Sequence, residues 1–450
     1  MQTFDLIVIG SGVAGSIAAS TCRSAGWTVA VVDSLPFGGT CALRGCDPKK
    51  VLVGAADLLD WSCRMNRKHA VKGHLEIEWP ELGRFKRTFT DPVPQHKEQS
   101  FGEAGIKCLH GRAKFIGRTA IEVAGDKFEA RHFLIATGAT PAHLKIPGEA
   151  HLIDSTRFME LEQLPKDIVF VGGGLIAMEF AHVAVRAGSQ VTVLHRGDRV
   201  LESFDPDLVS MLSGATIALG VPVHTATSVE AIEKAANGRL SIHAKQYGKN
   251  VQFECDLAVH AAGRIPDLAD LALDMAGVST EKRGVAVNEY LQSISNPAIY
   301  AGGDAAATEG PPLTPVAGYD GKLIAANLLN GNHLQAEYHL IPSVVFTIPP
   351  LAAVGLSEQA AHQQGLRFRR NNSAIGDWYS SLRVAEKTAA YKVLVEEGTG
   401  RILGAHLLGP AAEETINLFT LAMRFNITAE QLKQVLFAYP SHASDIKFML

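Results

Sequence analysis

The chain has 450 residues, 47% of them hydrophobic, and its 42 Lys and Arg against 46 Asp and Glu leave a formal net charge of −4. This size and apolar content suit about three folded domains and exclude disorder as the main state. The charge balance disfavours binding to nucleic acid or to a membrane surface, and the N-terminus resembles neither a signal peptide nor an anchor, which predicts a cytoplasmic protein.

The first elements are typical of a nucleotide-binding unit. Phe4 to Ile9 is expected to be a buried strand, followed by a turn containing Gly10, Gly12 and Gly15, an apolar helix, and a second strand from Val29 to Asp33. The three glycines allow a tight bend, a close approach of the backbone to a pyrophosphate, and close packing of helix on strand. The Asp33 carboxylate lies where ribose hydroxyls can donate to it. The segment predicts dinucleotide binding, and the alternative is a tight structural turn.

Only two of the six cysteines, Cys41 and Cys46, form a close pair. On a regular helix, at about 100° per residue, their sulfur atoms would lie about 140° apart, too far round to bond. A bridge therefore needs a distorted turn, and three glycines permit one: Gly38, Gly39 and Gly45. Pro48 suits a first helical turn and leaves Cys46 near a helix N-terminus, where a thiolate is favoured; Lys49 adds positive charge, whereas an Asp47 carboxylate turned inward would raise the Cys46 pKa.

We interpret this cysteine pair as redox-active. The alternatives are two inert buried thiols or a metal site, and the absence of a second close pair or of clustered histidines argues against zinc. No resident metal is expected.

After a polar stretch from Trp61 to Gln99 without clean periodicity, a second nucleotide-type unit begins. A strand from Ile168 to Val171 leads into a glycine turn starting at Gly172, a helix through Ala187, and a strand from Gln190 to Leu194. The residues after this strand include Arg196 and Arg199 in place of an acid. Because an acid would repel the 2′-phosphate of NADP and arginines pair with it, the turn predicts an NADPH site. The alternative is that both arginines are solvated surface residues.

The C-terminal block, beginning near Tyr338, is expected to be a separate α+β domain. Its predicted strands are Ile341–Phe346, Tyr391–Glu396 and Ile402–Leu408, and its predicted helices are Ala411–Phe425 and Ala429–Leu436.

The segment Gly38–Lys50 (GGTCALRGCDPKK) resembles the redox motif of the class I flavoprotein disulfide reductases, a family that includes glutathione reductase, dihydrolipoyl dehydrogenase and mercuric reductase. Further motifs agree in order along nearly the whole chain: Ala136-Thr137-Gly138, the second glycine turn with Glu179, Ala262-Gly263-Arg264-Ile265-Pro266, Gly302-Gly303-Asp304, Leu313-Thr314-Pro315-Val316-Ala317, and Val345-Phe346-Thr347 before Pro349-Pro350.

The resemblance implies an α/β fold with two Rossmann-like dinucleotide-binding domains and a C-terminal α+β dimerisation domain, in a homodimer. The expected FAD-binding domain comprises residues 1–150 and 263–335, the NAD(P)H-binding domain residues 151–262, and the interface domain residues 336–450.

The resemblance also implies roles for individual residues. Cys46 would be the thiol against the flavin and Cys41 the outer thiol that attacks the substrate. Lys49 and Glu179 would pair near the reactive nitrogen of the flavin, and Asp304 would bind the ribityl chain. The expected cofactor-binding residues are Gly10, Gly12, Gly15, Asp33, Gly39, Thr40, Lys49, Ala113, Thr137, Gly138, Arg264, Asp304, Thr314, Ala317, Gly172, Gly174, Ile176, Glu179, Arg196, Arg199 and Gly263.

The chain departs from the family pattern near its C-terminus. Where glutathione reductase and dihydrolipoyl dehydrogenase have a His-Pro pair followed by a glutamate, this chain has Tyr439, Pro440 and Ser444. A tyrosine can donate a proton but is a poor base at pH 7. His442 is the other candidate acid and base, unless it is an exposed loop histidine, and whether Asp445 replaces the glutamate stays open.

The resulting hypothesis is an FAD-dependent oxidoreductase that passes electrons from NADPH through FAD to the Cys41–Cys46 disulfide and on to a small disulfide or another thiol-reactive oxidant. Mercuric reductases also carry a tyrosine at the position of Tyr439, but this sequence lacks their C-terminal cysteine pair, and Ser20 stands where glutathione reductases place an arginine. The alternatives are a metal-ion (mercuric-reductase-like) or diaphorase-type reductase, or a flavin-bound redox sensor.

Overall fold

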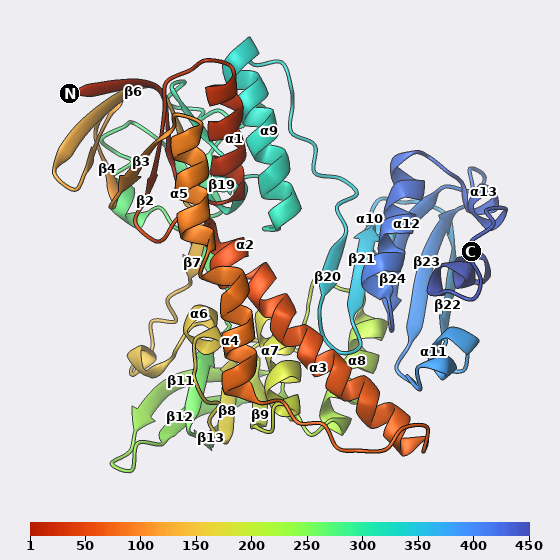
Figure 1. Ribbon diagram of the computed structural model, residues 1–450. Coiled ribbons are helices and arrows are strands. Elements are labelled where there is room, and N and C mark those ends of the chain that lie inside the picture. The colour runs from red at the N-terminus through yellow and green to blue at the C-terminus, as the bar shows by residue number, and fades with distance from the viewer. The chain divides into compact units, whose positions relative to one another are not determined.

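The chain folds into two units, and each is assembled from three separate stretches of sequence. The computed structural model describes residues 1–450 and is drawn in Figure 1. The first unit consists of Met1–Lys49, Arg84–Ala142 and Gly263–Tyr338. The second unit consists of Lys50–Gly83, His143–Ala262 and His339–Leu450. The stretches expected to bind NAD(P)H and to form the interface therefore both belong to the second unit.

A seven-stranded sheet forms the core of the first unit, in the order β3-β2-β1-β6-β5-β4 with β18 beside β6. Strands β1, β2, β3, β6 and β18 run parallel to their neighbours in this set. Val8 and Val31, paired in register on β1 and β2, are fully buried, as expected of apolar strands covered on both faces. The strand bounds are Gln2–Ile9 (β1), Val29–Asp33 (β2), Lys107–His110 (β3), Ala113–Gly117 (β4), Ala120–Val123 (β5), Asp126–Ile135 (β6) and Ile299–Ala301 (β18).

The helices of the first unit place its glycine turn and its cysteines. Helix α1 (Val13–Ser24) follows β1 through the glycine turn and packs side by side with α9 (Thr314–Asn330), as Figure 1 shows. The remaining elements of this unit are α2 (Gly39–Arg44), the start of α3 (Cys46–Arg67), α5 (Val93–Glu103), the strand pair β7 (Ala139–Pro141) and β15 (Arg264–Pro266), and the small sheet of β16 (Thr280–Glu281), β17 (Gly284–Ala286) and β19 (Ala306–Ala307).

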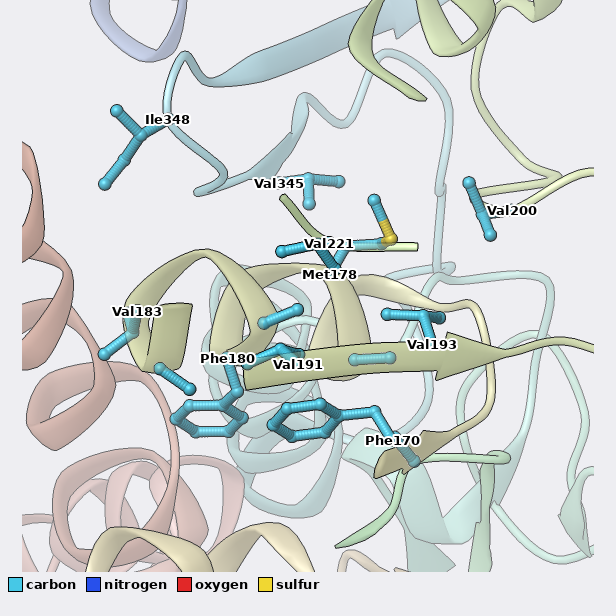
Figure 2. Close-up of a cluster of buried hydrophobic side chains, with 14 of the residues drawn as sticks. Phe170, Met178, Phe180, Val183, Val191, Val193, Val200, Val221, Val345 and Ile348 are labelled. Carbon is cyan, nitrogen blue, oxygen red and sulfur yellow. The ribbon is translucent and has the colours of Figure 1, made fainter. Parts of the chain in front are cut away.

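The second unit contains a four-stranded parallel sheet in the order β10-β9-β8-β14. Helix α7 (Leu175–Arg186) packs on this sheet, and Figure 2 shows Met178, Phe180 and Val183 of α7 near Phe170 and Val191 of the sheet. The strands are β8 (Asp167–Val171), β9 (Gln190–Leu194), β10 (Val223–His224) and β14 (Leu257–His260), accompanied by α6 (Ser155–Met159), α8 (Pro206–Ala218) and the antiparallel strands β11 (Thr227–Lys234), β12 (Leu240–Gln246) and β13 (Lys249–Cys255).

The C-terminal part of the second unit is an antiparallel sheet in the order β20-β21-β24-β23-β22, with α12 (Ala412–Arg424) against β21 and β24. The predicted strands correspond to β20 (Ser343–Val345), β23 (Ala390–Glu396) and β24 (Ile402–Leu408). Two further strands were not predicted, β21 (Leu351–Gly355) and β22 (Phe368–Ala374). The other elements here are α10 (Glu358–Gln363), α11 (Tyr379–Arg383), α13 (Ala429–Lys433) and α14 (Ile446–Met449).

The stretch from Trp61 to Gln99, which shows no clean periodicity in sequence, is largely helical. It contains the end of α3, all of α4 (Trp79–Thr90) and the start of α5. In α4, Trp79 is buried and its indole N–H donates to the Leu161 carbonyl at 2.8 Å, while Phe85 and Phe89 are exposed. Trp79, Leu82, Phe85 and Phe89 recur at spacings of three and four residues, so α4 has the apolar pattern of a helix and was missed in the sequence. No helix of the chain combines the length and apolar character needed to cross a membrane.

Candidate active site

A break between two helices brings the cysteine pair together. Helix α2 ends at Arg44, Gly45 adopts φ −146° and ψ −112°, and α3 begins at Cys46. The two cysteines therefore lie on different helices, with the distorted turn between them that their spacing requires. Gly39, at φ +75°, approaches the first glycine turn so closely that a Cβ atom there would lie 2.4 Å from the Cα of Gly12. Only glycine fits this contact.

The two thiols differ in their surroundings and therefore in acidity. The Cys46 Sγ lies 3.2 Å from the Thr314 hydroxyl oxygen, and the Cys41 Sγ lies 3.9 Å from a carboxylate oxygen of Asp47. A hydrogen bond from the Cys41 thiol, together with Thr314 and the charge of Lys49, lowers the pKa of Cys46 to about 6 despite partial desolvation and the Asp47 charge. Donation of that same hydrogen bond, together with burial, raises the pKa of Cys41. Cys46 is thus the thiolate of the pair and Cys41 holds the proton.

The first glycine turn is tied to the segment that carries the cysteines. One Asp33 carboxylate oxygen accepts from the backbone N–H of Ser11 at 2.8 Å and from its hydroxyl at 2.6 Å, and the other accepts from the N–H of Leu35 at 2.9 Å. The Ser11 hydroxyl oxygen also accepts from the N–H of Gly38 at 3.0 Å. Ser11 is fully buried. Its linking role was missed in sequence because a serine inside a glycine turn has no distinctive local signal.

The second glycine turn, between β8 and α7, is followed by a loop in which the two predicted arginines differ. Arg196 is exposed. Arg199 donates to the backbone carbonyls of Glu202 at 2.9 Å and Phe204 at 3.2 Å. His195 lies beside the loop, with its Nε2 3.2 Å from a Glu202 carboxylate oxygen. Arg196 is therefore available to a phosphate, whereas Arg199 holds the shape of the loop.

Glu179 is the fifth residue of α7 and is fully buried. Its Oε1 accepts from the backbone N–H of Phe346 at 2.8 Å. Lys49 belongs to the other unit, so its expected pairing with Glu179 stays a prediction.

The candidate acid and base residues near the C-terminus occupy different environments. Tyr439 is 81% exposed. His442 is half-buried in a short 3₁₀ helix, His442–Asp445, and both residues line a cavity of about 30 Å³. Burial and the charge of Arg383 lower the pKa of His442, against the opposing effect of Asp445. Asp445 itself accepts a hydrogen bond from the Ser380 hydroxyl. His442 is therefore half-buried and is not an exposed loop histidine.

The chain matches the pyridine nucleotide-disulphide oxidoreductase family over residues 4–321 and the dimerisation domain of that family over residues 341–449. The chain belongs to this family. The mercuric reductase of Staphylococcus aureus is 32% identical over 453 residues, which cover 99% of this chain and 81% of that protein. The glutathione reductase of Burkholderia cepacia is 32% identical over 446 residues, covering 98% of this chain and 97% of that protein.

The solved structure of the HOCl-induced flavoprotein disulfide reductase RclA from Escherichia coli, as its Cu(II) complex, is also similar. It has a TM-score of 0.89 and 26% identity, and the match covers 100% of this chain and 99% of that one. The expected family and α/β fold are confirmed, and the protein is an FAD-dependent pyridine nucleotide-disulphide oxidoreductase that uses NAD(P)H.

The first unit of this disulphide oxidoreductase has features that fit FAD. The Thr137 hydroxyl oxygen, just after β6, is buried without a hydrogen-bond partner in the chain, as expected where a polar ligand supplies the partner. Helix α1 begins after Gly12 without a side-chain cap, so its first N–H groups can face a pyrophosphate. Burial raises the pKa of Asp304, and the charge of Arg264 opposes this.

A buried carboxylate that the sequence reading did not single out supports the loop containing Asp304. Asp320, on α9, is fully buried and accepts from the backbone N–H of Gly303 at 2.8 Å and from the Tyr338 hydroxyl at 2.9 Å. The same helix begins at Thr314, which contacts Cys46. Helix α9 therefore joins the cysteine pair to the loop expected to hold the ribityl chain.

The expected cofactor-binding residues divide between the two units. Those in 10–49, 113–138 and 263–317 belong to the first unit, and those in 172–199 belong to the second. Each unit therefore contains one of the two glycine turns together with the cofactor-binding residues expected around it.

Proposed function

We propose that the protein passes two electrons from NADPH to the Cys41–Cys46 disulfide and from Cys41 to a small disulfide or another thiol-reactive oxidant. The observation that carries this proposal is the asymmetry of the two thiols, with Cys46 stabilised as a thiolate and Cys41 kept protonated. Bound FAD supplies the step that accepts a hydride from the nicotinamide and delivers an electron pair to the disulfide.

The residues of the chain account for the thiol half of the reaction. Cys41, once deprotonated, attacks one sulfur of a substrate disulfide, which forms a mixed disulfide and releases one substrate thiolate. The Cys46 thiolate then attacks the Cys41 sulfur, which restores the Cys41–Cys46 disulfide and releases the second thiolate. Each thiolate takes a proton, so one disulfide becomes two thiols per NADPH.

In the family pattern the C-terminal acid and base serves the other subunit of the dimer, and His442 is the better candidate for the residue that deprotonates Cys41 across the proposed homodimer. Its pKa lies below the ordinary value for histidine because of burial and Arg383, so its imidazole is neutral at pH 7 and can accept a proton. The Tyr439 phenol, which is exposed, can donate a proton to a leaving thiolate. Asp445 next to His442 would take the place of the glutamate in the family pattern.

Steady-state turnover tests the proposed function. The wild-type protein should oxidise many equivalents of NADPH when a small disulfide is the oxidant, such as glutathione disulfide, cystine or dithiobis(nitrobenzoate). Cys41→Ala should lose this activity. A protein that takes up one set of electrons and stops would instead be a redox sensor. NADPH oxidation with quinones that persists in Cys41→Ala would indicate a diaphorase.

Metal ions are a second candidate class of oxidant. The similar RclA structure is a Cu(II) complex, and relatives include mercuric reductases. The structure shows no group of three or more His, Cys, Asp or Glu placed to hold a metal ion, and the candidate contacts for a metal substrate are the thiols of Cys41 and Cys46. NADPH oxidation driven by Cu(II) or Hg(II), and lost in Cys41→Ala, supports this candidate; its absence together with disulfide turnover rejects it.

A homodimer completes the proposal. The dimerisation-domain match covers 341–449, and apolar side chains in this range are exposed in the single chain: Leu421, Phe425, Leu436 and Phe448. Such side chains suit the apolar part of a stable interface. Light scattering of the purified protein should give twice the mass of one chain, and a monomer at micromolar concentration would contradict the proposal.

A further inference from the structure

One face of α7 binds the backbone of the segment Phe346–Ile348. Glu179 accepts from the N–H of Phe346 at 2.8 Å, and His182 Nδ1 accepts from the N–H of Ile348 at 3.1 Å. Arg186 donates to the Ile348 carbonyl at 3.3 Å. The spacing of three and four residues places the three side chains on one face of the helix. Figure 2 shows Ile348 on the segment that passes beside α7.

The hydrogen bonds of His182 fix its protonation state. A backbone N–H can only donate, so Nδ1 is the acceptor toward Ile348. The Thr216 hydroxyl donates to the Leu212 carbonyl at 2.8 Å, so it must accept from His182 Nε2–H, which lies 2.9 Å away. Burial and the charge of Arg186 lower the pKa of His182 to about 3. The imidazole is therefore neutral with its proton on Nε2.

The apolar surroundings of His182 indicate that its polar side chain has a specific role. The side chain is 1% exposed on a helix whose neighbouring buried residues, Ala181 and Val183, are apolar. A leucine would fill this space at no desolvation cost, whereas a buried imidazole is tolerated only when its nitrogens are paired. Besides Thr216 and the more distant Arg186 guanidinium, its partner is the backbone N–H of Ile348, two residues beyond Phe346.

The N–H groups of Phe346 and Ile348 both meet acceptors on α7, Glu179 and His182. Two such contacts set the register of the segment along the helix, and a single contact does not.

We propose that His182 is a positioning residue that holds the segment 346–348 in register and thereby keeps the N–H of Phe346 on the Glu179 carboxylate. The functional part of this inference rests on the proposed function, in which Glu179 acts near the reactive part of the flavin. The structural part concerns only the backbone contacts within the second unit.

The fold does not depend on this contact alone. Arg186 also forms an ion pair with Asp60 on α3 at 2.8 Å, and Val345 and Ile348 belong to the apolar cluster around α7. His182→Leu should therefore fold while leaving the Ile348 N–H without an acceptor. His182→Asn is the conservative variant, because its side-chain oxygen can take the place of Nδ1. His406→Leu is the matched control, since His406 is likewise buried and bonds the carbonyl of Leu356 at 3.1 Å.

Hydrogen exchange and rapid-mixing kinetics of the holoenzyme test the inference together. His182→Leu should speed exchange at the Phe346 and Ile348 amides and slow flavin reduction by NADPH about tenfold, a change of about 1.4 kcal/mol. His182→Asn should recover most of the rate, and His406→Leu should leave both measurements unchanged. In a Glu179→Gln background, His182→Leu should add no further slowing, because it acts through Glu179.

Unchanged exchange at the two amides in His182→Leu would overturn the structural part of the inference. Equal slowing by His182→Leu in the wild-type and Glu179→Gln backgrounds would overturn the claim that His182 acts through Glu179. Normal flavin reduction in Glu179→Gln alone would instead overturn the role of Glu179 in the proposed function, whatever the exchange data show.

Discussion

The sulfur of Cys46 lies 3.2 Å from the hydroxyl of Thr314, and each of these residues is the first of a helix, α3 and α9. Helix N-termini carry partial positive charge and stabilise anions. Two helix starts that are far apart in sequence thus meet at the thiol whose pKa is lowered to about 6. The environment that stabilises the Cys46 thiolate therefore depends on the contact between the N-termini of α9 and α3 as well as on the spacing of Cys41 and Cys46.

The Thr314 hydroxyl should contribute measurably to this acidity. In Thr314→Val the side chain keeps its volume but loses the hydrogen bond to Cys46, so the pKa of Cys46 should rise by about 1 unit, the value of one hydrogen bond to a charged group. The pH dependence of iodoacetamide alkylation of the reduced protein measures the change. Thr90→Val, which removes a buried hydroxyl that bonds Asp91 instead, is the control. If the pH midpoint of alkylation does not shift in Thr314→Val, the two helix N-termini and Lys49 lower the pKa of Cys46 without the Thr314 hydroxyl.

The exposed Arg196 should determine the preference for NADPH over NADH. Arg196→Leu should lower kcat/KM for NADPH by about 10- to 100-fold, as expected for a lost charge-assisted hydrogen bond to phosphate, and leave NADH nearly unaffected. Arg199→Leu should affect both nucleotides alike, because Arg199 bonds the carbonyls of Glu202 and Phe204. Steady-state kinetics with the two nucleotides separate these cases. Equal losses with NADPH and NADH in Arg196→Leu would count against the assignment.

Asp320 should support binding of FAD through the loop that contains Gly303 and Asp304. Asp320→Ala removes the acceptor of both the Gly303 N–H and the Tyr338 hydroxyl, and Tyr338→Phe removes only the second bond. We expect Kd for FAD to rise about tenfold in Asp320→Ala and less in Tyr338→Phe. Flavin fluorescence during reconstitution of the apoprotein gives both values. The reverse order of the two variants would contradict a role for the Gly303 contact.

Buried His182 should make stability depend on pH. Its ordinary pKa is 6.5, and burial with the charge of Arg186 lowers the pKa in the folded chain to about 3. Between these values the unfolded chain binds a proton that the folded chain does not, so this contribution to stability is complete above about pH 6.5 and is lost as the pH falls, by about 1.4 kcal/mol per pH unit.

His182→Asn has no group that titrates in this window. The difference in free energy of unfolding between wild type and His182→Asn should therefore shrink as the pH is lowered from 7 to 4. Urea unfolding at several pH values measures it, and a difference that stays constant over the range would show that folding does not lower the pKa of His182.

Much of the fold follows from local patterns. The buried runs of β1 and β2, the glycine turn between β1 and α1, and the strands β23 and β24 lie where hydrophobic periodicity places them. The helix break at Gly45 follows from the spacing of Cys41 and Cys46 and the glycines around them. Such features depend on neighbours a few residues away, which a single sequence displays.

The missed features depend on contacts between distant residues. The short strands β21 and β22 become recognisable only by pairing with β24 and β23. In the site, Asp320 reaches the Gly303 amide only because α9 packs beside that turn. No spacing rule in the sequence predicts this contact.

The most direct test of the central claim, that Cys41 and Cys46 form the working electron acceptor with Cys46 as the thiolate, is an anaerobic titration of the holoenzyme with NADPH, followed by absorbance. The account predicts that the first two electrons open the disulfide and produce a long-wavelength band from the Cys46 thiolate beside oxidised FAD. The appearance of this band on reduction should require both cysteines, because only a Cys41–Cys46 disulfide can be opened by the two electrons. Direct bleaching of the flavin absorbance by the first two electrons, without that band, would contradict the account.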